Sequence, residues 1–236
     1  MESIRKKQIV IWGAGRHAMV VAHTADIAGG FEVCGFLDDI NPVPRVGPYK
    51  GRMVLGGREV LATNQLNGVD GIALGIGDCL ARLSLGKLIQ ESGFQVPTII
   101  HPTSAIASDV LIGEGSVILA GAVIDPGCRI GKFCIINNNA TICHDSSIED
   151  GCHICPGTSI AGGVTIGRGT WIGIGAAIIE NIFIGEGSLV GAGAVVIRSI
   201  PARSVCYGNP ARVSRKVDGD GISISDCGTY PRGIAS

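Results

Sequence analysis

An isoleucine or valine occupies every sixth position of this chain between residues 100 and 196, without one interruption. The first fifteen of these seventeen positions are isoleucine, and the last two are Val190 and Val196. The fourth residue after each is small in most hexads, as Ala122 and Cys134 illustrate. Neither an α-helix, with a period of 3.6, nor a flat strand, with a period of 2, keeps one residue type at every sixth place. A parallel β-helix does, because its short strands stack their inward side chains coil upon coil.

Three hexads in each triangular coil would give this β-helix about 5.7 coils and a height of roughly 27 Å, at ~4.8 Å between strands. Each isoleucine buried inside contributes about 1.5–3 kcal/mol to stability. Sharp corners need backbone conformations with positive φ, which glycine adopts without strain. We therefore expect positive φ at glycines that follow the leading isoleucine by one or three positions. These are Gly113, Gly115, Gly131, Gly167, Gly169, Gly185 and Gly187.

The first hundred residues lack the hexad repeat and alternate between strands and helices, which is typical of an α/β domain. A buried strand leads through a glycine-rich turn into a helix and a second strand, which makes one βαβ unit. A third strand and a second helix follow. The predicted strands are 8–12, 31–37 and 71–76, and the predicted helices are 19–28 and 79–92. We expect a small, Rossmann-like parallel sheet in a domain of residues 1–98.

Glycine-rich or acidic segments follow all three predicted strands: Gly13–His17, Asp38-Asp39 and Gly77-Asp78. Ligands of parallel sheets bind beyond the carboxyl ends of the strands, and the free N–H groups of a helix N-terminus suit a phosphate. The first turn matches G-x-G-x-x-A, but Asp38 comes later than the ~20 residues typical of dinucleotide-binding domains. With so short a domain, this favours a mononucleotide or nucleotide sugar over NAD. The alternative is that the glycines only let helix and strand pack closely.

The composition argues against several classes of protein. The net charge is −1 and the longest basic run is Arg5-Lys6-Lys7, which disfavours a nucleic-acid partner. No apolar run is long enough for a membrane span, and the one before Gly13 is too short for a signal peptide. Nine cysteines without framework spacing indicate the cytoplasm. The single C-x-x-C of residues 152–155 permits a metal site, but packing is the favoured interpretation and no metal is expected.

Polar side chains with catalytic potential interrupt the repeat in adjacent hexads between residues 136 and 153. His144 and His153 fall at hexad positions that can point away from the interior. An imidazole beside a carboxylate is the usual pair for a general base near neutral pH, because the carboxylate fixes the tautomer and raises the basicity. Asp145 is the partner that the sequence offers to His144. The alternative is that the histidines are only polar surface residues.

Several of these motifs together resemble one family of enzymes. They are the hexapeptide repeat, Gly13–His17, Phe36-Leu37-Asp38-Asp39, Ile99-Ile100-His101-Pro102, Asn137, Thr141-Ile142-Cys143-His144-Asp145, His153 and Tyr207-Gly208-Asn209-Pro210-Ala211-Arg212. Over residues 8–213 the chain resembles the sialic-acid O-acetyltransferase-like sugar acetyltransferases. Within that group it is most similar to the nucleotide-sugar N-acetyltransferases of the bacillosamine and perosamine type. It departs from their pattern at Arg16, where Gly or Ser is common, and in residues 214–236, which we expect to be a loosely ordered extension.

The resemblance implies a left-handed parallel β-helix in residues 99–213, a homotrimer, and acetyl-CoA bound between neighbouring β-helices. It implies acetylation of the 4-amino group of a nucleotide-linked 4-amino-4,6-dideoxy sugar, for bacterial surface glycan or glycoprotein biosynthesis. UDP is the expected nucleotide, and the sequence leaves GDP and dTDP open. His144 would be the catalytic base and Asp145 would orient it. The residues implied to contact acetyl-CoA are His153, Gly162, Ile174 and Ala192. Those implied to bind the nucleotide sugar are Gly13, Gly15, Arg16, His17, Asp38, Asp39, Gly77, Asp78 and Asn137, and Asn137 would line the same site as His144.

Three other functions are compatible with the repeat. An O-acetyltransferase acting on a free sugar such as a sialic acid shares the fold, although the nucleotide-ready first domain favours the N-acetyltransferase. A metal-dependent hydratase of the γ-carbonic anhydrase kind needs three histidine ligands, for which the β-helix offers His144, His153 and the distant His101. A non-catalytic scaffold would leave the cluster of His, Asp and Asn without a role.

Overall fold

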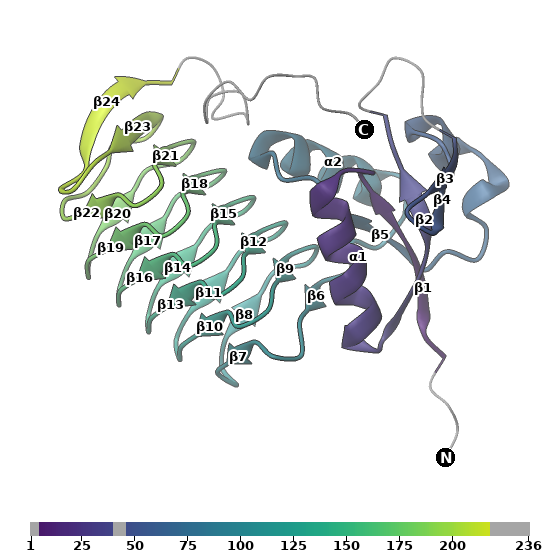
Figure 1. Ribbon diagram of the computed structural model, residues 1–236, viewed down its shortest axis with the longest axis horizontal. Coiled ribbons are helices and arrows are strands. Elements are labelled where there is room, and N and C mark those ends of the chain that lie inside the picture. The colour runs from purple at the N-terminus through teal and green to yellow at the C-terminus, as the bar shows by residue number, and fades with distance from the viewer. Residues whose placement is uncertain (1–4, 40–45, 218–236) are drawn as a thin grey trace.

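The computed structural model describes residues 5–39 and 46–217, which form two regions lying side by side (Figure 1). The N-terminal region holds a five-stranded sheet in the order β3-β4-β2-β1-β5, parallel except for the β3–β4 hairpin. Its elements are β1 (Lys7–Trp12), α1 (Arg16–Ala28), β2 (Phe31–Leu37), β3 (Gly47–Tyr49), β4 (Arg52–Val54), β5 (Gly71–Leu74) and α2 (Cys79–Glu91), with 3₁₀ turns at Arg58–Ala62 and Asn64–Leu66. The predicted α/β fold is confirmed. Helix α1 begins three residues earlier than predicted, because Gly15 is its N-cap.

One helix covers each face of this sheet. Both faces are apolar, because the apolar side chains of β1 alternate between them. Ile9 and Ile11 pack against α1 in a buried cluster that also takes in residues of the second region. Val10 and Trp12 pack against α2 on the opposite face, in a cluster that includes Phe133 of the second region. The two regions therefore share apolar cores, and close packing fixes how they sit against each other.

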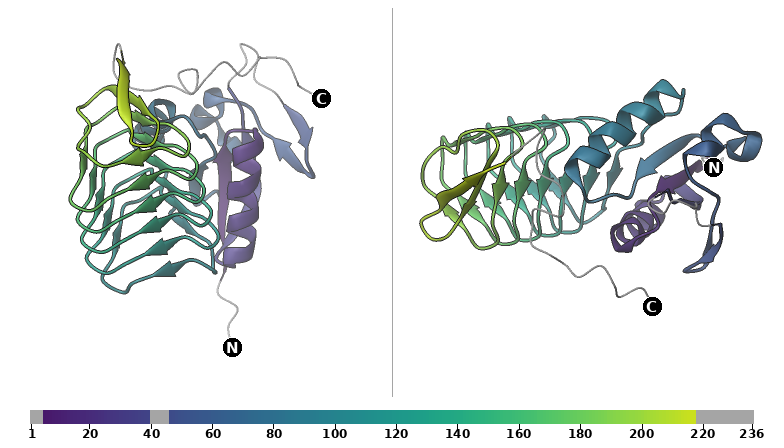
Figure 2. Two further views of the ribbon diagram at one scale, coloured as in Figure 1. Left: turned by 60° about the vertical axis from the view of Figure 1, so that its left-hand side comes forward. Right: turned by 90° about the horizontal axis from the view of Figure 1, so that it is seen from above.

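The second region is a left-handed parallel β-helix whose coils stack along one axis (Figure 2). Each strand pairs with the strand three hexads further on, as Ile124 pairs with Ile142, so three hexads form one coil as predicted. The strands are β6 (Ile99–Ile100), β7 (Ala105–Ile106), β8 (Leu111–Ile112), β9 (Val117–Ile118), β10 (Val123–Ile124), β11 (Arg129–Ile130), β12 (Ile135–Ile136), β13 (Thr141–Ile142), β14 (Ser147–Ile148), β15 (His153–Ile154), β16 (Ser159–Ile160), β17 (Thr165–Ile166), β18 (Trp171–Ile172), β19 (Ala177–Ile178), β20 (Phe183–Ile184), β21 (Leu189–Val190) and β22 (Val195–Val196). An antiparallel pair, β23 (Ser204–Tyr207) and β24 (Arg212–Lys216), closes the far end.

The leading residues of the hexads form the interior column that the repeat predicted. From Ile118 to Val196, each of them is at most 3% exposed. The expectation was wrong for Ile100, which is 37% exposed, and Ile106 and Ile112 are only partly buried. These three belong to the first coil, which has a neighbouring coil on one side only.

The glycines of the corners serve two different purposes. Those at the third position after the leading isoleucine have positive φ as predicted: Gly115, Gly169 and Gly187. Those at the first position do not, and the expectation was wrong for them: Gly113, Gly131, Gly167 and Gly185. A Cβ atom added to Gly167 would lie 2.5 Å from the main-chain nitrogen of Glu186 in the next coil. These glycines are therefore needed because successive corners approach closely.

Among residues 5–39 and 46–217, no helix has the length and apolar character required to cross a membrane. Residues 214–216 belong to β24, which pairs with β23. The remainder of the extension for which loose order is expected, residues 218–236, lies outside the described residues.

Candidate active site

Three columns of corners run along the β-helix, and the candidate residues are divided between them. The Asn137 corner (137–140) joins β12 to β13, the His144 corner (143–146) joins β13 to β14, and the Gly151 corner (149–152) joins β14 to β15. Because each coil repeats the previous one, an equivalent corner lies next to each of these in the following coil.

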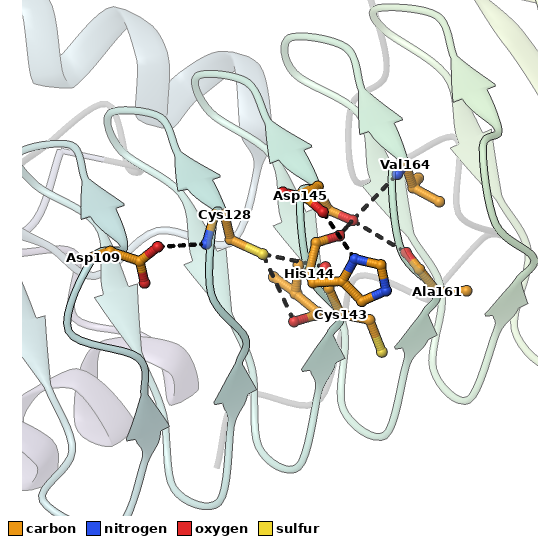
Figure 3. A network of polar contacts seen from close by, with 10 residues as sticks. Asp109, Cys128, Cys143, His144, Asp145, Ala161 and Val164 are labelled. Carbon is orange, nitrogen blue, oxygen red and sulfur yellow. Dashed lines mark hydrogen bonds and ion pairs between the residues drawn. The ribbon is translucent and has the colours of Figure 1, made fainter.

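His144 and Asp145 are hydrogen-bonded to each other at the His144 corner (Figure 3). His144 Nδ1 lies 2.9 Å from Asp145 Oδ2, and the two side chains are 67% and 74% exposed. These adjacent side chains can meet because Asp145 has a φ of +58°, which turns the chain sharply. A carboxylate only accepts hydrogen bonds, so a neutral His144 carries its proton on Nδ1 and keeps Nε2 as the basic nitrogen. This is the geometry of a general base with its orienting acid.

Gly162 lies against the imidazole ring of His144, one coil further along the same column. A Cβ atom added to Gly162 would come within 2.6 Å of His144 Cε1 and 2.7 Å of Nε2. The main chain holds the two coils together here, since the N–H of Gly163 donates to His144 O over 2.9 Å. The position of the His144 ring therefore requires glycine at 162.

A cavity of about 450 Å³ opens on the sheet of β15, β18 and β21 and on the adjoining Asn137 corner. Four residues that the sequence singled out line it: Asn137, His153, Ile174 and Ala192. Ile174 is 60% exposed, and Trp171 and Tyr207 contribute aromatic rings to the lining. A largely apolar cavity with a few polar groups is typical of a site for a small organic ligand.

His153 lines this cavity and is itself buried. Its Nε2 lies 3.1 Å from Asn137 Nδ2, and the orientation of that amide is set because Asn137 Oδ1 accepts from the N–H of Asn138 over 2.9 Å. Its Nδ1 lies 3.4 Å from Gly77 O. Since the amide N–H donates and the carbonyl accepts, the ring proton of His153 sits on Nδ1. Burial, with a smaller contribution from the charge of Arg82, holds the pKa of His153 well below its ordinary value, so the ring is neutral.

The N-terminus of α1 offers unobstructed N–H groups. Gly15 caps the helix without a side-chain hydrogen bond, and nothing lies within 4 Å of its Cβ position. Gly13 has a φ of +116°, and a Cβ atom there would lie 2.8 Å from Gly75 O, so only glycine fits. Arg16, the first residue of α1, is exposed. Free N–H groups at a helix N-terminus can bind a phosphate.

His17, in the first turn of α1, reaches toward the β-helix. Its ring centroid is 6.3 Å from that of His153. Its Nε2 is buried and has no hydrogen-bond partner among the described residues. Burial, together with the charge of Arg82, lowers the pKa of His17 to about 4. A neutral imidazole with an unused, buried ring nitrogen therefore lies at this junction.

A second cavity, of about 530 Å³, lies between α2 and the segments that follow the strands. Asp39, Arg58 and Asp78 are its charged lining residues. Asp39 accepts hydrogen bonds from Arg58 Nη2 over 2.7 Å and from Trp12 Nε1 over 3.0 Å. Asp78 also caps α2, because its side chain accepts from an N–H of the first turn over 2.9 Å. Asp38 is buried, at 5% exposure. The carboxylates at this cavity can accept hydrogen bonds from a ribose or a base.

Within one chain, the predicted site residues fall into four groups, one of which is Gly13, Gly15 and Arg16 at the N-terminus of α1. The second group is at the apolar cavity, with His17 and Gly77 beside His153. The third is at the charged cavity, and the fourth is His144, Asp145 and Gly162. Asn137, which the resemblance places in one site with His144, lies at a different corner of the chain from His144. The sequence missed Trp171, whose ring centroid is 4.3 Å from that of His153, and also Arg58 and Arg82. Trp171 could have been found, because it holds the hexad position of His153 in the next coil.

Among the described residues, no three His, Cys, Asp or Glu side chains are grouped so that they could hold a metal ion. Cys152 is buried in the interior column, whereas His153 faces outward into the apolar cavity. His101 hydrogen-bonds to Thr103 at its own corner. The three histidines that a hydratase would need do not come together in one chain.

Family models match both regions of the chain. The model described as PglD N-terminal domain matches residues 8–88, and the model described as bacterial transferase hexapeptide (six repeats) matches residues 127–162. A search of curated proteins gave no match.

Solved structures match over most of the chain. The acetyltransferase domain of PglB from Neisseria gonorrhoeae FA1090, in complex with acetyl coenzyme A, is 32% identical with a TM-score of 0.82, over 89% of this chain and 100% of that chain. PerB from Caulobacter crescentus, in complex with CoA and GDP-perosamine, is 33% identical with a TM-score of 0.83, over 90% of this chain and 100% of that chain. The chain belongs to the hexapeptide family of nucleotide-sugar N-acetyltransferases. WeeI from Acinetobacter baumannii AYE also resembles this hexapeptide enzyme, at 27% identity and a TM-score of 0.75, over 88% of this chain and 100% of that chain.

Proposed function

We propose that this chain transfers the acetyl group of acetyl-CoA to the 4-amino group of a nucleotide-linked 4-amino-4,6-dideoxy sugar. The observation that carries the proposal is the hydrogen-bonded pair of His144 and Asp145 on the β-helix. The β-helix is joined to an α/β domain in which the N-terminus of α1 can bind a phosphate. PerB was solved with CoA and GDP-perosamine. Two further structures of that perosamine N-acetyltransferase have a histidine replaced by asparagine or alanine.

His144 is the general base of the proposed reaction. The amine nitrogen attacks the carbonyl carbon of the thioester, so that a C–N bond forms and the C–S bond breaks. Nε2 of His144 accepts the proton that the amine loses, and this proton then neutralises the departing CoA thiolate. Asp145 holds the Nδ1–H and stabilises the imidazolium while the proton is on the ring.

No covalent enzyme intermediate is required, because the amine can attack the thioester directly in a ternary complex. Cys143 stands next to His144, but partial burial and the nearby Asp125 carboxylate raise the pKa of its thiol. A thiol with a raised pKa is a poor nucleophile, since the thiolate is the reactive form. Cys143 is therefore a bystander.

Acetyl-CoA occupies the apolar cavity in this proposal. His153, Ile174 and Ala192 line it. Gly173 and Gly191 also line it and, having no side chains, leave space for the ligand. Gly162, also expected to contact acetyl-CoA, lies beneath His144 and so places the thioester beside the base. The neutral His153 offers no charge to the uncharged thioester arm.

The nucleotide sugar lies along the ends of the parallel strands. Its pyrophosphate is placed at the N-terminus of α1, beside Gly13, Gly15 and Arg16. Asp39 and Asp78, with Asp38 nearby, accept hydrogen bonds from the nucleoside in the charged cavity. UDP is the nucleotide that we propose. His17 and Gly77 lie beside His153, where this region adjoins the apolar cavity that Asn137 lines, and the sugar must meet acetyl-CoA there.

We propose a homotrimer in which the His144 corner of one chain meets the apolar cavity of its neighbour. The support is that a single chain holds His144 and the cavity residue Asn137 at different corners of the β-helix. A complete site would then need two chains. Sedimentation of the purified protein tests this: a trimer is expected, and a monomer with full activity would overturn it.

We place the enzyme in the cytoplasm, in the synthesis of a bacterial surface glycan or glycoprotein. All eight cysteines within the described residues are free thiols, which suits a reducing compartment. We also propose the domain limits 1–98, from the alternation of strands and helices in the sequence, and 99–213, from the resemblance to the family.

The experiment that tests the function measures CoA release from acetyl-CoA with several acceptors. UDP-, GDP- and dTDP-linked 4-amino sugars are compared with a free sialic acid, and the products are identified by mass spectrometry. N-acetylation of one nucleotide amino sugar is expected, with the UDP form preferred. Acetylation of the free sialic acid alone would establish the O-acetyltransferase instead.

A further inference from the structure

Arg82 of α2 is fully buried, at 0% exposure, although it carries a permanent charge. Burying a guanidinium is unfavourable unless its N–H groups are all satisfied. Such acceptors come from carboxylates or from a place where several main-chain carbonyl groups converge. Arg82 lies at such a place, at the junction between the α/β domain and the Gly151 corner.

The guanidinium donates to carbonyl groups from both regions. On the β-helix side, Nε donates to Phe133 O over 2.6 Å, and Nη2 donates to Gly151 O over 2.8 Å and Cys152 O over 3.2 Å. On the α/β side, Nη1 donates to the carbonyls that precede α2. These are Ile76 O at 3.1 Å, Gly77 O at 2.8 Å and Asp78 O at 3.4 Å. One side chain therefore ties the loop before α2 to the Gly151 corner.

This loop is part of both substrate sites. Ile76 and Asp78 line the charged cavity. The carbonyl of Gly77, which Arg82 holds, is also the acceptor for His153 Nδ1. A carbonyl oxygen has two lone pairs, so it can accept from both groups at once. The bond from Nδ1 leaves His153 Nε2 to accept from Asn137 in the apolar cavity.

We propose that Arg82 is a positioning residue that holds the nucleotide-sugar site and the acetyl-CoA site in one fixed relation, through the carbonyl of Gly77. This inference rests on the proposed function for the identity of the two ligands. Arg82 touches neither ligand site directly, because its donors are used on main-chain carbonyls and on Cys79 Sγ. Its effect on the reaction passes through Gly77 and His153.

The test compares Arg82→Lys and Arg82→Met with a control at the next residue, Leu83→Ala. Lysine keeps the charge but replaces a planar fork of five donors with one ammonium group, which cannot reach both sets of carbonyls. Leu83 packs over Gly151 at the same junction and bonds to no loop carbonyl, so its truncation loosens the junction without freeing Gly77.

Both Arg82 variants should raise the Kd of acetyl-CoA and the KM of the accepted nucleotide sugar about tenfold each, the effect of losing hydrogen bonds to a charged group. Because Arg82 sets the relation of the two sites but handles no reacting proton, kcat should also fall, by less than the loss expected for His144→Ala. Leu83→Ala should lower Tm and leave both constants near wild type. Folded Arg82 variants with unchanged constants, or with only one constant changed, would overturn the joint positioning.

A second measurement does not depend on the variants folding or on the substrate. The ¹⁵N chemical shifts of the His153 imidazole in ligand-free wild-type protein report which nitrogen carries the proton. The proposal requires the proton on Nδ1, and a proton on Nε2 would overturn it. If the wild-type enzyme acetylates no nucleotide sugar, the proposed function fails, while the His153 tautomer and the Kd of acetyl-CoA still decide the role of Arg82.

Discussion

Replacing Gly162 with alanine is expected to damage catalysis while leaving the fold intact. Gly162 does not have a positive φ, so the backbone accepts alanine. The added methyl carbon would meet His144 Cε1 at 2.6 Å, and ordinary contact begins at 3.4 Å, so the ring must move by about 0.8 Å. The ring is free to move, because the side chain of His144 is 67% exposed. The bond between His144 Nδ1 and Asp145 then loses its geometry.

A displacement of about 1 Å at a catalytic group can lower the rate by about 10²-fold, so kcat of Gly162→Ala should fall by roughly 10- to 10²-fold. Tm should change by less than about 2 °C, as for a surface substitution. Steady-state kinetics with both substrates and a thermal melt measure these two quantities. Gly30→Ala is the matched control, because Gly30 also lacks a positive φ and has open space at its Cβ position.

Two results would refute this reasoning. Wild-type kcat in Gly162→Ala would show that the position of the His144 ring does not limit the reaction. A raised KM for acetyl-CoA with unchanged kcat would show that Gly162 only contacts the donor. Only a loss of kcat in the Gly162 variant, absent from the Gly30 variant, supports the assignment.

Three further substitutions test other parts of the structure. Ile154→Ala removes a side chain at 0% exposure from the interior column and should lower the free energy of unfolding by about 2–5 kcal/mol; a melt no earlier than wild type would contradict the hexad register. Asp39→Ala should raise KM for the nucleotide sugar and leave KM for acetyl-CoA nearly unchanged, whereas equal effects on both would argue against separate sites. Cys143→Ala should keep most of the activity, and its complete loss would point to a covalent intermediate.

The β-helix was predictable from sequence because every coil makes the same contacts. One leading isoleucine or valine in each hexad fixes the register. The predicted burial of these residues fails only in the first coil, where the repetition begins, as at Ile100. The hydrogen-bonded pair of His144 and Asp145 was also predictable, since the two residues are adjacent in the chain. Local sequence therefore determines most of the second region.

Contacts between distant segments could not be predicted. Arg82 lies three residues after Cys79 and four before Gly86, a spacing that places it on the buried face of α2 with no partner visible in the sequence. Its acceptors at Phe133 and Gly151 are far along the chain, and they are main-chain carbonyls, which carry no sequence signal. The division of the site residues between separate corners, in contrast, follows from three hexads in each coil, because Asn137 and His144 stand in adjacent hexads.

The most direct test of the proposed mechanism is kcat of His144→Ala at neutral pH with acetyl-CoA and the accepted nucleotide sugar. A general base typically supplies about 10²–10⁴-fold, so kcat should fall by that factor while both substrates still bind. Asp145→Asn should cost less, because Asp145 orients the imidazole and does not accept the amine proton. A His144→Ala enzyme with near wild-type kcat at neutral pH would contradict the mechanism.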